Sequence, residues 1–327
     1  MGSRLRARNG PCTLLAGSEV PGPRLPGSYL SQFPFRHPGV PPLGRPMRFA
    51  VSGWIFHHDP AKVLGRVVDL AHSLGYDGLE IPTLDARLEL RRIREGLGNP
   101  PRMIPIWVGG GSPPRDLSNP SERIQRAGVA YLRRLVDLCA GSGGELVAGP
   151  LYGAVGRVRY LSPPRRDAAL SRVARHLSLV ARYAASRSVR IALEPLNRYD
   201  TSLVNTVAQG IELLERIGEP NVGLALDTFH MNIEERSAGK ALREAGRQLF
   251  YLQACENDRG AVGSGHVPWT ERRDALRSIS YDGWVGVESF IPSPPGFAEA
   301  MRMWRPVAAS PQELAGASLS FLQGLFP

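Results

Sequence analysis

An α/β fold of the (β/α)8, or TIM, barrel class is predicted by three features of the sequence. Short apolar runs alternate with segments of helical periodicity from residue 47 to residue 327. The apolar runs are continuous, as is typical of parallel strands that are buried on both faces. Glycine or proline stands at most junctions, and no linker divides residues 47–327 into two domains.

Eight apolar runs are the candidate strands. In chain order they read RFAVSGW, DGLEIP, MIPIWV, ELVAG, VRIALE, VGLALD, FYLQAC and WVGVES. Helical periodicity is clearest in Ala61–Leu74, Ser121–Cys139, Asp167–Ser186, Val207–Ile217 and Ser310–Leu325. Eight β-α units within 281 residues (327 minus 46) fit a closed barrel. A doubly wound sheet, the alternative, would need fewer strands or a second domain.

Residues 1–46 differ in composition from the rest of the chain. They contain nine prolines, six arginines and one acidic residue, without a periodic apolar pattern. Such a segment buries too little apolar surface to fold by itself. We therefore expect a disordered or non-structural N-terminal extension over residues 1–46 and a single catalytic barrel domain over residues 47–327. A transit peptide is the less favoured interpretation of the arginine-rich segment.

Composition and charge argue against several classes of protein. The net charge is +10, but five of these charges (six arginines minus one acid) lie in residues 1–46, and no basic stripe indicates a nucleic-acid partner. No uncharged apolar stretch approaches the roughly 20 residues of a membrane span, and no secretory signal is evident. We expect a cytoplasmic protein that binds neither nucleic acid nor membrane.

The three cysteines are far apart in the sequence. Cys12, Cys139 and Cys255 form no C-x-x-C pair, so the sequence indicates neither a zinc ribbon nor a disulfide framework. We expect Cys139 and Cys255 to be small residues of the core.

Oxygen-bearing side chains stand at or near the ends of the last four candidate strands. They are Glu194, Asp227, Gln253 and Glu288, separated by 33, 26 and 35 residues (227 − 194, 253 − 227 and 288 − 253), about one β-α unit each. In a barrel of this class the active site lies where strands end and the following loops begin. Three carboxylates in one place repel each other unless a cation neutralises them, so the pattern predicts a divalent metal site. For any single acid, a helix cap or a loop position facing water is the simpler interpretation.

Longer motifs around these residues resemble those of a known family. EPLNRYDT, GLALDTFHMNIEE, ENDRGAVGSGHVPW and GWVGVESF are similar to motifs of the sugar isomerases and epimerases with the xylose-isomerase-like barrel, most of all the D-tagatose and D-psicose (allulose) 3-epimerases. The resemblance runs from about Met47 to the C-terminus. It implies an isomerase, an epimerase acting on carbohydrates, with a small-molecule ketose substrate and a homo-oligomeric state, dimer or tetramer.

The resemblance also implies which residues bind the metal ion. In that family Glu, Asp, His and Glu from strands five to eight are the ligands, and Glu194, Asp227 and Glu288 match three of them. Gln253 stands where the family has its ligand histidine. A glutamine carbonyl can coordinate, but it is a weaker ligand than imidazole and favours oxygen-loving ions. We expect Mn²⁺, with Mg²⁺ or Co²⁺ as alternatives.

Three further residues match substrate-binding positions of the family. His230, three residues after Asp227, and Arg259 match a substrate-binding histidine and arginine. Asp200, six residues after Glu194, stands where the epimerases carry glutamate. A structural histidine and a surface-loop arginine are the alternative interpretations.

The predicted function is a metal-dependent ketose 3-epimerase. Deprotonation beside a ketone leaves an enediolate, which a metal ion stabilises. Inversion at C3 then needs two proton-transfer groups on opposite faces, and Glu194 and Glu288 fit that role. Hydroxypyruvate isomerase and inosose dehydratase are alternatives within the family. A non-catalytic sugar-binding protein is an alternative of another class, although it would have no need for two proton donors.

Overall fold

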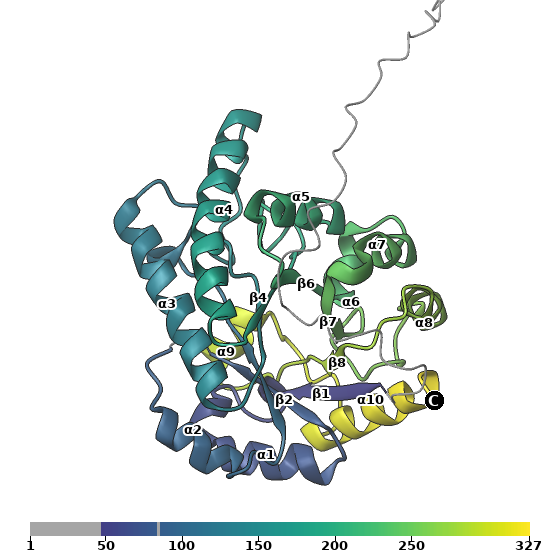
Figure 1. Cartoon of the computed structure of the whole chain (residues 1–327). Helices are drawn as coiled ribbons and strands as arrows, with labels where there is room; N and C mark the ends of the chain where they lie inside the picture. Colours follow the sequence, from purple (N-terminus) through teal and green to yellow (C-terminus); the bar gives the residue numbers. More distant parts are fainter. Residues whose placement is uncertain (1–46, 84–85) are drawn as a thin grey trace, which may run out of the picture. The chain divides into compact units, whose positions relative to one another are not determined.

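The computed structural model describes residues 47–83 and 86–327 of the 327-residue chain (Figure 1). The predicted extension over residues 1–46 lies outside the described residues. The boundary at residue 47 therefore stays a prediction.

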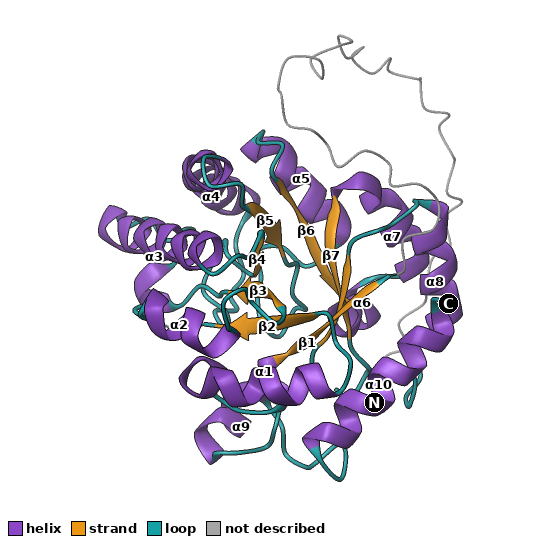
Figure 2. Ribbon diagram, turned by 60° about the horizontal axis from the view of Figure 1, so that its bottom comes forward, coloured by secondary structure: helices purple, strands orange, loops and turns teal. Residues whose placement is uncertain are grey.

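Within the described residues, eight parallel strands pair in chain order and close into a barrel. They are β1 (Arg48–Ser52), β2 (Gly78–Pro82), β3 (Ile104–Val108), β4 (Leu146–Gly149), β5 (Arg190–Leu193), β6 (Val222–Asp227), β7 (Leu249–Ala254) and β8 (Trp284–Val287). Strand β8 pairs with β1, where Val285 lies opposite Phe49, and this pairing closes the ring. Figure 2 shows the strands at the centre with helices around them. The predicted (β/α)8 barrel is confirmed.

Helices connect the strands and cover the outside of the barrel. They are α1 (Leu64–Ser73), α2 (Leu90–Leu97), α3 (Glu122–Gly141), α4 (Pro163–Ala185), α5 (Val207–Ile217), α6 (Thr228–Glu234), α7 (Ala238–Ala245), α8 (Trp269–Ser278), α9 (Pro295–Met301) and α10 (Pro311–Leu325). Short 3-10 helices are η1 (Gly53–Ile55), η2 (Pro60–Val63), η3 (Pro113–Arg115) and η4 (Gly246–Gln248).

The bounds of the predicted helices follow from local signals at their ends. Helix α5 has the predicted bounds, since Thr206 and Gln209 form a capping box at its start and Gly218 ends it in the left-handed conformation. Helix α4 begins at Pro163, four residues before the predicted start, because proline suits the first turn of a helix. Helix α2 was not predicted; only Ile93 and Leu97 are buried on it, so its apolar pattern is weak.

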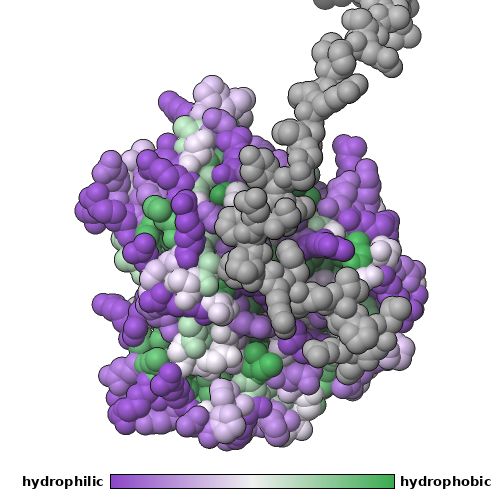
Figure 3. Space-filling view, in the orientation of Figure 1, coloured by the Kyte–Doolittle hydropathy of each residue, from purple (hydrophilic) through white to green (hydrophobic). Residues whose placement is uncertain are grey.

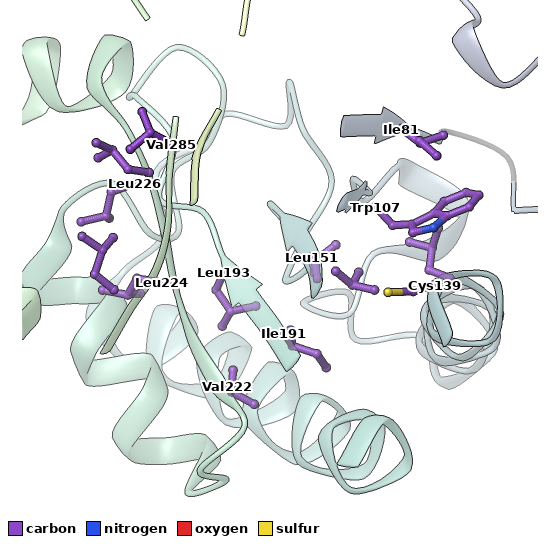
Figure 4. Packing of buried hydrophobic residues seen from close by; sticks show 14 of the residues in the cluster. Ile81, Trp107, Cys139, Leu151, Ile191, Leu193, Val222, Leu224, Leu226 and Val285 are labelled. Atoms are coloured by element: carbon purple, nitrogen blue, oxygen red, sulfur yellow. The ribbon is translucent and has the colours of Figure 1, made fainter. Parts of the chain in front are cut away.

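Side chains of the barrel strands alternate between two cores. Outward residues such as Ile191, Leu193, Leu224 and Leu226 belong to the cluster between strands and helices (Figure 4). The inner cluster is small and consists of Ala50, Ile106, Leu146, Ala148, Ala192, Ala225, Tyr251 and Trp284. Because the period of a strand is two, residues 194 and 227 project to the same inner side as Ala192 and Ala225. The alternation therefore directs the predicted acids into the barrel mouth.

Gly286 makes room for a polar group inside the barrel. A Cβ atom at this position would lie 1.7 Å from the hydroxyl oxygen of Tyr251. The Tyr251 hydroxyl donates a hydrogen bond of 2.5 Å to Glu80 Oε1, on the far side of the barrel in β2. A side chain at residue 286 would displace this contact.

The outer helix faces carry charged side chains. Arg91 pairs with Glu95 on α2 at 2.9 Å, and Arg126 pairs with Glu122 on α3 at 3.1 Å. On the face in Figure 3, hydrophilic residues predominate outside the grey atoms. Among the described residues, none of the helices has the length and apolarity that a membrane span requires.

Candidate active site

Three buried carboxylates meet at the C-terminal end of the barrel. Asp227 is the last residue of β6, and Glu194 and Glu288 directly follow β5 and β8. Their exposed fractions are 1%, 5% and 6% respectively. Glu194, Asp227 and His230 offer potential ligand atoms that all lie within 4.8 Å of one another, and so do Asp227, Cys255 and Glu288. Asp227 belongs to both groups, so the structure brings the three predicted acids to one place.

The guanidinium of Arg259 lies among these groups. Its Nη1 is 2.8 Å from Asp227 Oδ2, 3.0 Å from Glu288 Oε2 and 2.9 Å from Cys255 Sγ. Positive charge at this point offsets the repulsion between the two buried carboxylates. Arg259, one of the three residues predicted to bind substrate, thus directly contacts Asp227 and Glu288, two of the predicted metal ligands.

Aromatic rings and a strained backbone hold Arg259 in position. The guanidinium lies over the ring of Phe229 at 4.1 Å and near that of Phe290 at 5.1 Å. The backbone of Arg259 has a φ of 64°, which is uncommon outside glycine, and its carbonyl accepts a hydrogen bond of 2.6 Å from Ser289. These contacts place the charge independently of the carboxylates.

Burial gives the three acids different proton affinities. It raises the pKa of Glu288 to about 8, although Arg259 opposes the shift. Burial, together with repulsion from Glu288 and Asp227, raises the pKa of Glu194 well above its ordinary value. Burial also acts to raise the pKa of Asp227, but attraction to Arg259 and His230 leaves it below its ordinary value. Glu288 can therefore carry a proton near neutral pH, whereas Asp227 is an anion.

His230 is held as a neutral imidazole. Its Nδ1 accepts a hydrogen bond of 3.1 Å from the backbone N–H of Asn197 and lies 2.8 Å from the side-chain amide of the same residue. Burial lowers the pKa of His230 to about 4. The remaining proton is thus on Nε2, which lies 3.6 Å from Glu194 Oε1 and 3.7 Å from Asp227 Oδ2. His230 presents an N–H donor to the carboxylate group.

Gln253 lies beside Asp227 in the register of β6 and β7. Its Nε2 donates a hydrogen bond of 3.1 Å to Glu80 Oε1. Its Oε1 is buried and has no hydrogen-bond partner among the described residues. A buried acceptor without a partner costs about 1–3 kcal/mol, so this oxygen is suited to a cation. The donor set of carboxylate and amide oxygens fits a divalent metal ion.

Glu80 was missed in the sequence although its signal was present. It is fully buried inside the barrel, at 0% exposure. Burial raises the pKa of Glu80 to about 7, partly offset by the hydrogen bond from Tyr251. Glu80 is the one acid within GLEIP, the residues of β2, and an acid in an apolar strand is the same kind of signal that pointed to the strand-end acids.

Cys255 is buried, as predicted, and so is Cys139. However, Cys255 is more than a small core residue, because its Sγ contacts Arg259 Nη1 and lies in the ligand group with Asp227 and Glu288. The alternation of β7 would have found it, since Gln253 lies two residues before Cys255. Burial also raises the pKa of the Cys255 thiol well above its ordinary value.

Asp200 belongs to neither group of potential ligands. Its Oδ1 pairs with Arg302 Nη1 at 3.2 Å, and its backbone carbonyl accepts a hydrogen bond of 2.8 Å from Gly156. These contacts join the loop after β5 to the loops after β4 and β8.

The sequence is similar to a described family over most of its length. The sequence model of the xylose isomerase-like TIM barrel family matches residues 68–307. A probable ketose 3-epimerase of Synechocystis sp. is 37% identical over 259 residues, which cover 77% of this chain and 88% of that protein. An L-ribulose 3-epimerase of Methylomonas sp. is 32% identical over 256 residues, with coverage of 77% and 88%.

The fold is similar to that of a solved epimerase. The crystal structure of D-allulose 3-epimerase from Methylomonas sp. in complex with D-allulose has a TM-score of 0.80 at 28% identity, and the match covers 86% of this chain and 98% of that one. The named relatives confirm the prediction that the chain is an enzyme, an isomerase of the epimerase class. The chain belongs to the xylose isomerase-like TIM barrel family.

Proposed function

We propose that the protein is a metal-dependent ketose 3-epimerase, which inverts C3 of a ketose by removing a proton and returning it to the opposite face. The observation that carries this proposal is the pair of buried carboxyls with raised pKa, Glu194 and Glu288, each of which offers an oxygen close to Asp227. The names of the relatives support the substrate class, since both are 3-epimerases of ketoses.

Glu194, Asp227, Gln253 and Glu288 are the residues that we propose hold a divalent metal ion. The unpartnered Oε1 of Gln253 and the cationic Nη1 of Arg259 between two of the carboxylates support a place for positive charge here. Mn²⁺ suits the oxygen donors, with Mg²⁺ or Co²⁺ as alternatives. When bound, the ion supplies positive charge that stabilises the negative charge developing on the sugar oxygens during deprotonation.

Glu194 and Glu288 are the proposed proton-transfer groups. One removes the C3 proton as a carboxylate, and the other returns a proton to the opposite face as a carboxylic acid. A raised pKa makes a carboxyl a stronger base when it is ionised and keeps the acid form populated near neutral pH. Because the two glutamates follow β5 and β8, they reach the barrel mouth from different loops.

His230, Arg259 and Asp200 are the proposed substrate-binding residues. The neutral His230 donates its Nε2–H to a sugar oxygen, in the direction that its contact with Asn197 sets. Arg259 places positive charge beside the reacting oxygens. Asp200, which pairs with Arg302 between the loops after β5 and β8, accepts hydrogen bonds from more distant hydroxyl groups of the sugar.

The decisive experiment follows hydrogen exchange at individual carbons. Purified protein with Mn²⁺ and a ketohexose in deuterated water should incorporate deuterium at C3 and form the C3 epimer, as NMR would detect. Glu288→Gln should abolish both, whereas Glu299→Gln, at an exposed position in α9, should abolish neither. Exchange at C1 without inversion at C3 would instead identify an aldose–ketose isomerase.

We also propose that residues 47–327 form one catalytic domain and that the protein is a cytoplasmic homo-oligomer, a dimer or tetramer. Light scattering of the purified full chain would measure the oligomeric state, and a monomer would contradict this part of the proposal. A chain that begins at Met47 should keep the activity of the full chain if the domain boundary is right.

A further inference from the structure

We propose that Cys255 is an additional ligand of the metal ion, through Sγ, and that it shifts the preference of the site from Mn²⁺ and Mg²⁺ toward Co²⁺ and Zn²⁺. This inference rests on the proposed metal-dependent function and adds a ligand and a selectivity to it. It also assigns a role to a residue that the sequence placed only in the core.

The cationic Nη1 of Arg259 lies at hydrogen-bonding distance from three atoms that could bind a metal ion. Arg259 Nη1 lies 2.8 Å from an oxygen of Asp227, 2.9 Å from the sulfur of Cys255 and 3.0 Å from an oxygen of Glu288. The three residues come from the ends of β6, β7 and β8. Their ligand atoms lie within 4.8 Å of one another, so one small cation can contact all three. Because Nη1 occupies this point, Arg259 and the ion compete for it.

The backbone holds Cys255 firmly beside Asp227. The N–H of Cys255 donates a hydrogen bond of 2.8 Å to Thr228 Oγ1, and the same hydroxyl donates one of 2.7 Å to the carbonyl of Cys255. Thr228 directly follows Asp227, so one residue fixes the end of β7 to the end of β6. The sulfur is thereby placed before any ion binds.

Gln253 provides an independent indication of the ligand position. It lies two residues before Cys255 and therefore on the same, inward side of β7. Its Oε1 is buried, at 1% residue exposure, and unpartnered among the described residues. One strand thus offers an amide oxygen and a sulfur at the same end of the barrel. A thiolate compensates for the weak amide ligand, because it adds negative charge and a soft donor.

Binding of the ion to Cys255 Sγ releases one proton, that of the thiol. As Sγ binds the ion, the S–H bond breaks, the proton leaves to water and a metal–sulfur bond forms. Thiolate ligands favour Co²⁺ and Zn²⁺, whereas carboxylate and carbonyl oxygens alone suit Mg²⁺ and Mn²⁺. The selectivity of the site therefore depends on this one sulfur.

Optical spectroscopy of the cobalt-loaded protein tests the proposal. The full chain with Cys12→Ser and Cys139→Ser keeps Cys255 as its single cysteine. Titration with Co²⁺ should produce a near-ultraviolet sulfur-to-cobalt charge-transfer band that saturates at one ion per chain. The same background with Cys255→Ser should lack the band, and the ratio of Co²⁺ to Mn²⁺ affinity from competition titrations should fall at least tenfold.

The outcomes of this titration distinguish the proposed role of Cys255 as a ligand from the proposed metal-dependent epimerase function. A cobalt-loaded protein with visible d–d bands but no charge-transfer band would overturn the role of Cys255 and leave the metal-dependent epimerase intact. Failure of the protein to bind Co²⁺ or Mn²⁺ at all would overturn both proposals. If Cys255→Ser fails to fold, the presence or absence of the band in the single-cysteine protein still decides the question.

Discussion

The two halves of the barrel mouth differ in chemistry although they share one architecture. Within the described residues, β1 to β4 end without charge, at Ser52, Pro82, Val108 and Gly149. The strands β5 to β8 end at or next to polar groups, namely Glu194, Asp227, Gln253, Cys255 and Glu288. Three of these residues, Asp227, Cys255 and Glu288, contact Arg259. The repeated β-α unit thus provides eight equivalent positions, and among the described strands only those of the second half place carboxyl, amide or thiol side chains at or next to their C-terminal ends.

The first half contributes the carboxyl group of Glu80, which is buried inside the barrel. Glu80 in β2 crosses the barrel to accept hydrogen bonds from Tyr251 and Gln253 in β7. It thereby sets which atom of the Gln253 amide is free. We therefore expect substitutions in the second half to lower catalytic activity. Substitutions in the first half should instead change how the proposed ligand side chains are oriented.

The largest expected effect tests the reactive half. Glu194→Gln should lower kcat for epimerisation by about 10⁴-fold, since it removes a general acid–base group at nearly constant volume. Steady-state kinetics at saturating metal would measure the loss. Glu212→Gln on α5, which keeps both glutamates of the mouth, is the matched control. A Glu194→Gln variant with more than a tenth of the original kcat would contradict the proton-transfer role of Glu194 and, with it, the proposed difference between the two halves.

The next prediction concerns the positive charge of Arg259, which contacts Asp227 and Glu288 in the second half. Arg259→Met should destabilise the metal-free protein by about 3–5 kcal/mol, because it leaves the buried Asp227 carboxylate without its cationic partner. Added Mn²⁺ should restore most of this stability, as urea unfolding with and without EDTA would show. Arg198→Met, at a pair with Glu234 in which the arginine side chain is 63% exposed, should cost about 1 kcal/mol or less. An equal loss for Arg259→Met with and without metal would refute this role of its charge.

A smaller effect tests the positioning role of the first half. Glu80→Gln should weaken metal binding about tenfold, since partners that orient a ligand typically contribute 10–100-fold in affinity. At saturating metal, kcat should return close to that of the unsubstituted protein. Calorimetric titration with Mn²⁺ separates this from a direct role. If activity stays lost at saturating metal, Glu80 belongs with the reactive groups and the division between the halves fails.

The last prediction concerns the pH dependence of stability. The pKa of Glu288 is raised to about 8 in the folded protein by burial, so the folded state binds a proton that the unfolded state releases above pH 4.5. Its contribution to stability is complete below about pH 4.5 and is lost as the pH rises through about 8, with a slope of at most about 1.4 kcal/mol per pH unit.

Urea unfolding of the metal-free protein between pH 5 and 8 would measure this slope. Glu288→Gln should reduce the loss of stability with rising pH, and Glu299→Gln should leave it unchanged. An identical pH dependence in the Glu288→Gln variant would show that the carboxyl does not carry the effect.

The fold and half of the candidate site could be predicted because their signals are local in the sequence. Continuous apolar runs mark parallel strands, and a strand that ends in an acid, as at Glu194 or Asp227, places that acid at the mouth of any barrel. The same kind of local signal was present for Glu80, an acid within a candidate strand, and for Cys255, two residues after Gln253, although neither was assigned to the site. The side-chain contacts themselves could not be predicted in this way, because they join separate segments, as Gln253 with Glu80 and Asp200 with Arg302 show.

Patterns along the chain were enough to place the apolar strands and the acids at their ends, because periodicity depends only on neighbouring residues. The tertiary structure alone decided that one guanidinium nitrogen contacts Asp227, Glu288 and Cys255 together, and that Gln253 turns its Nε2 toward Glu80. The contacts of Arg259 follow from the pairing of the neighbouring strands β6, β7 and β8. The contact between Gln253 and Glu80 follows from the pairing of β8 with β1, because closure of the ring brings β7 and β2 within reach of each other.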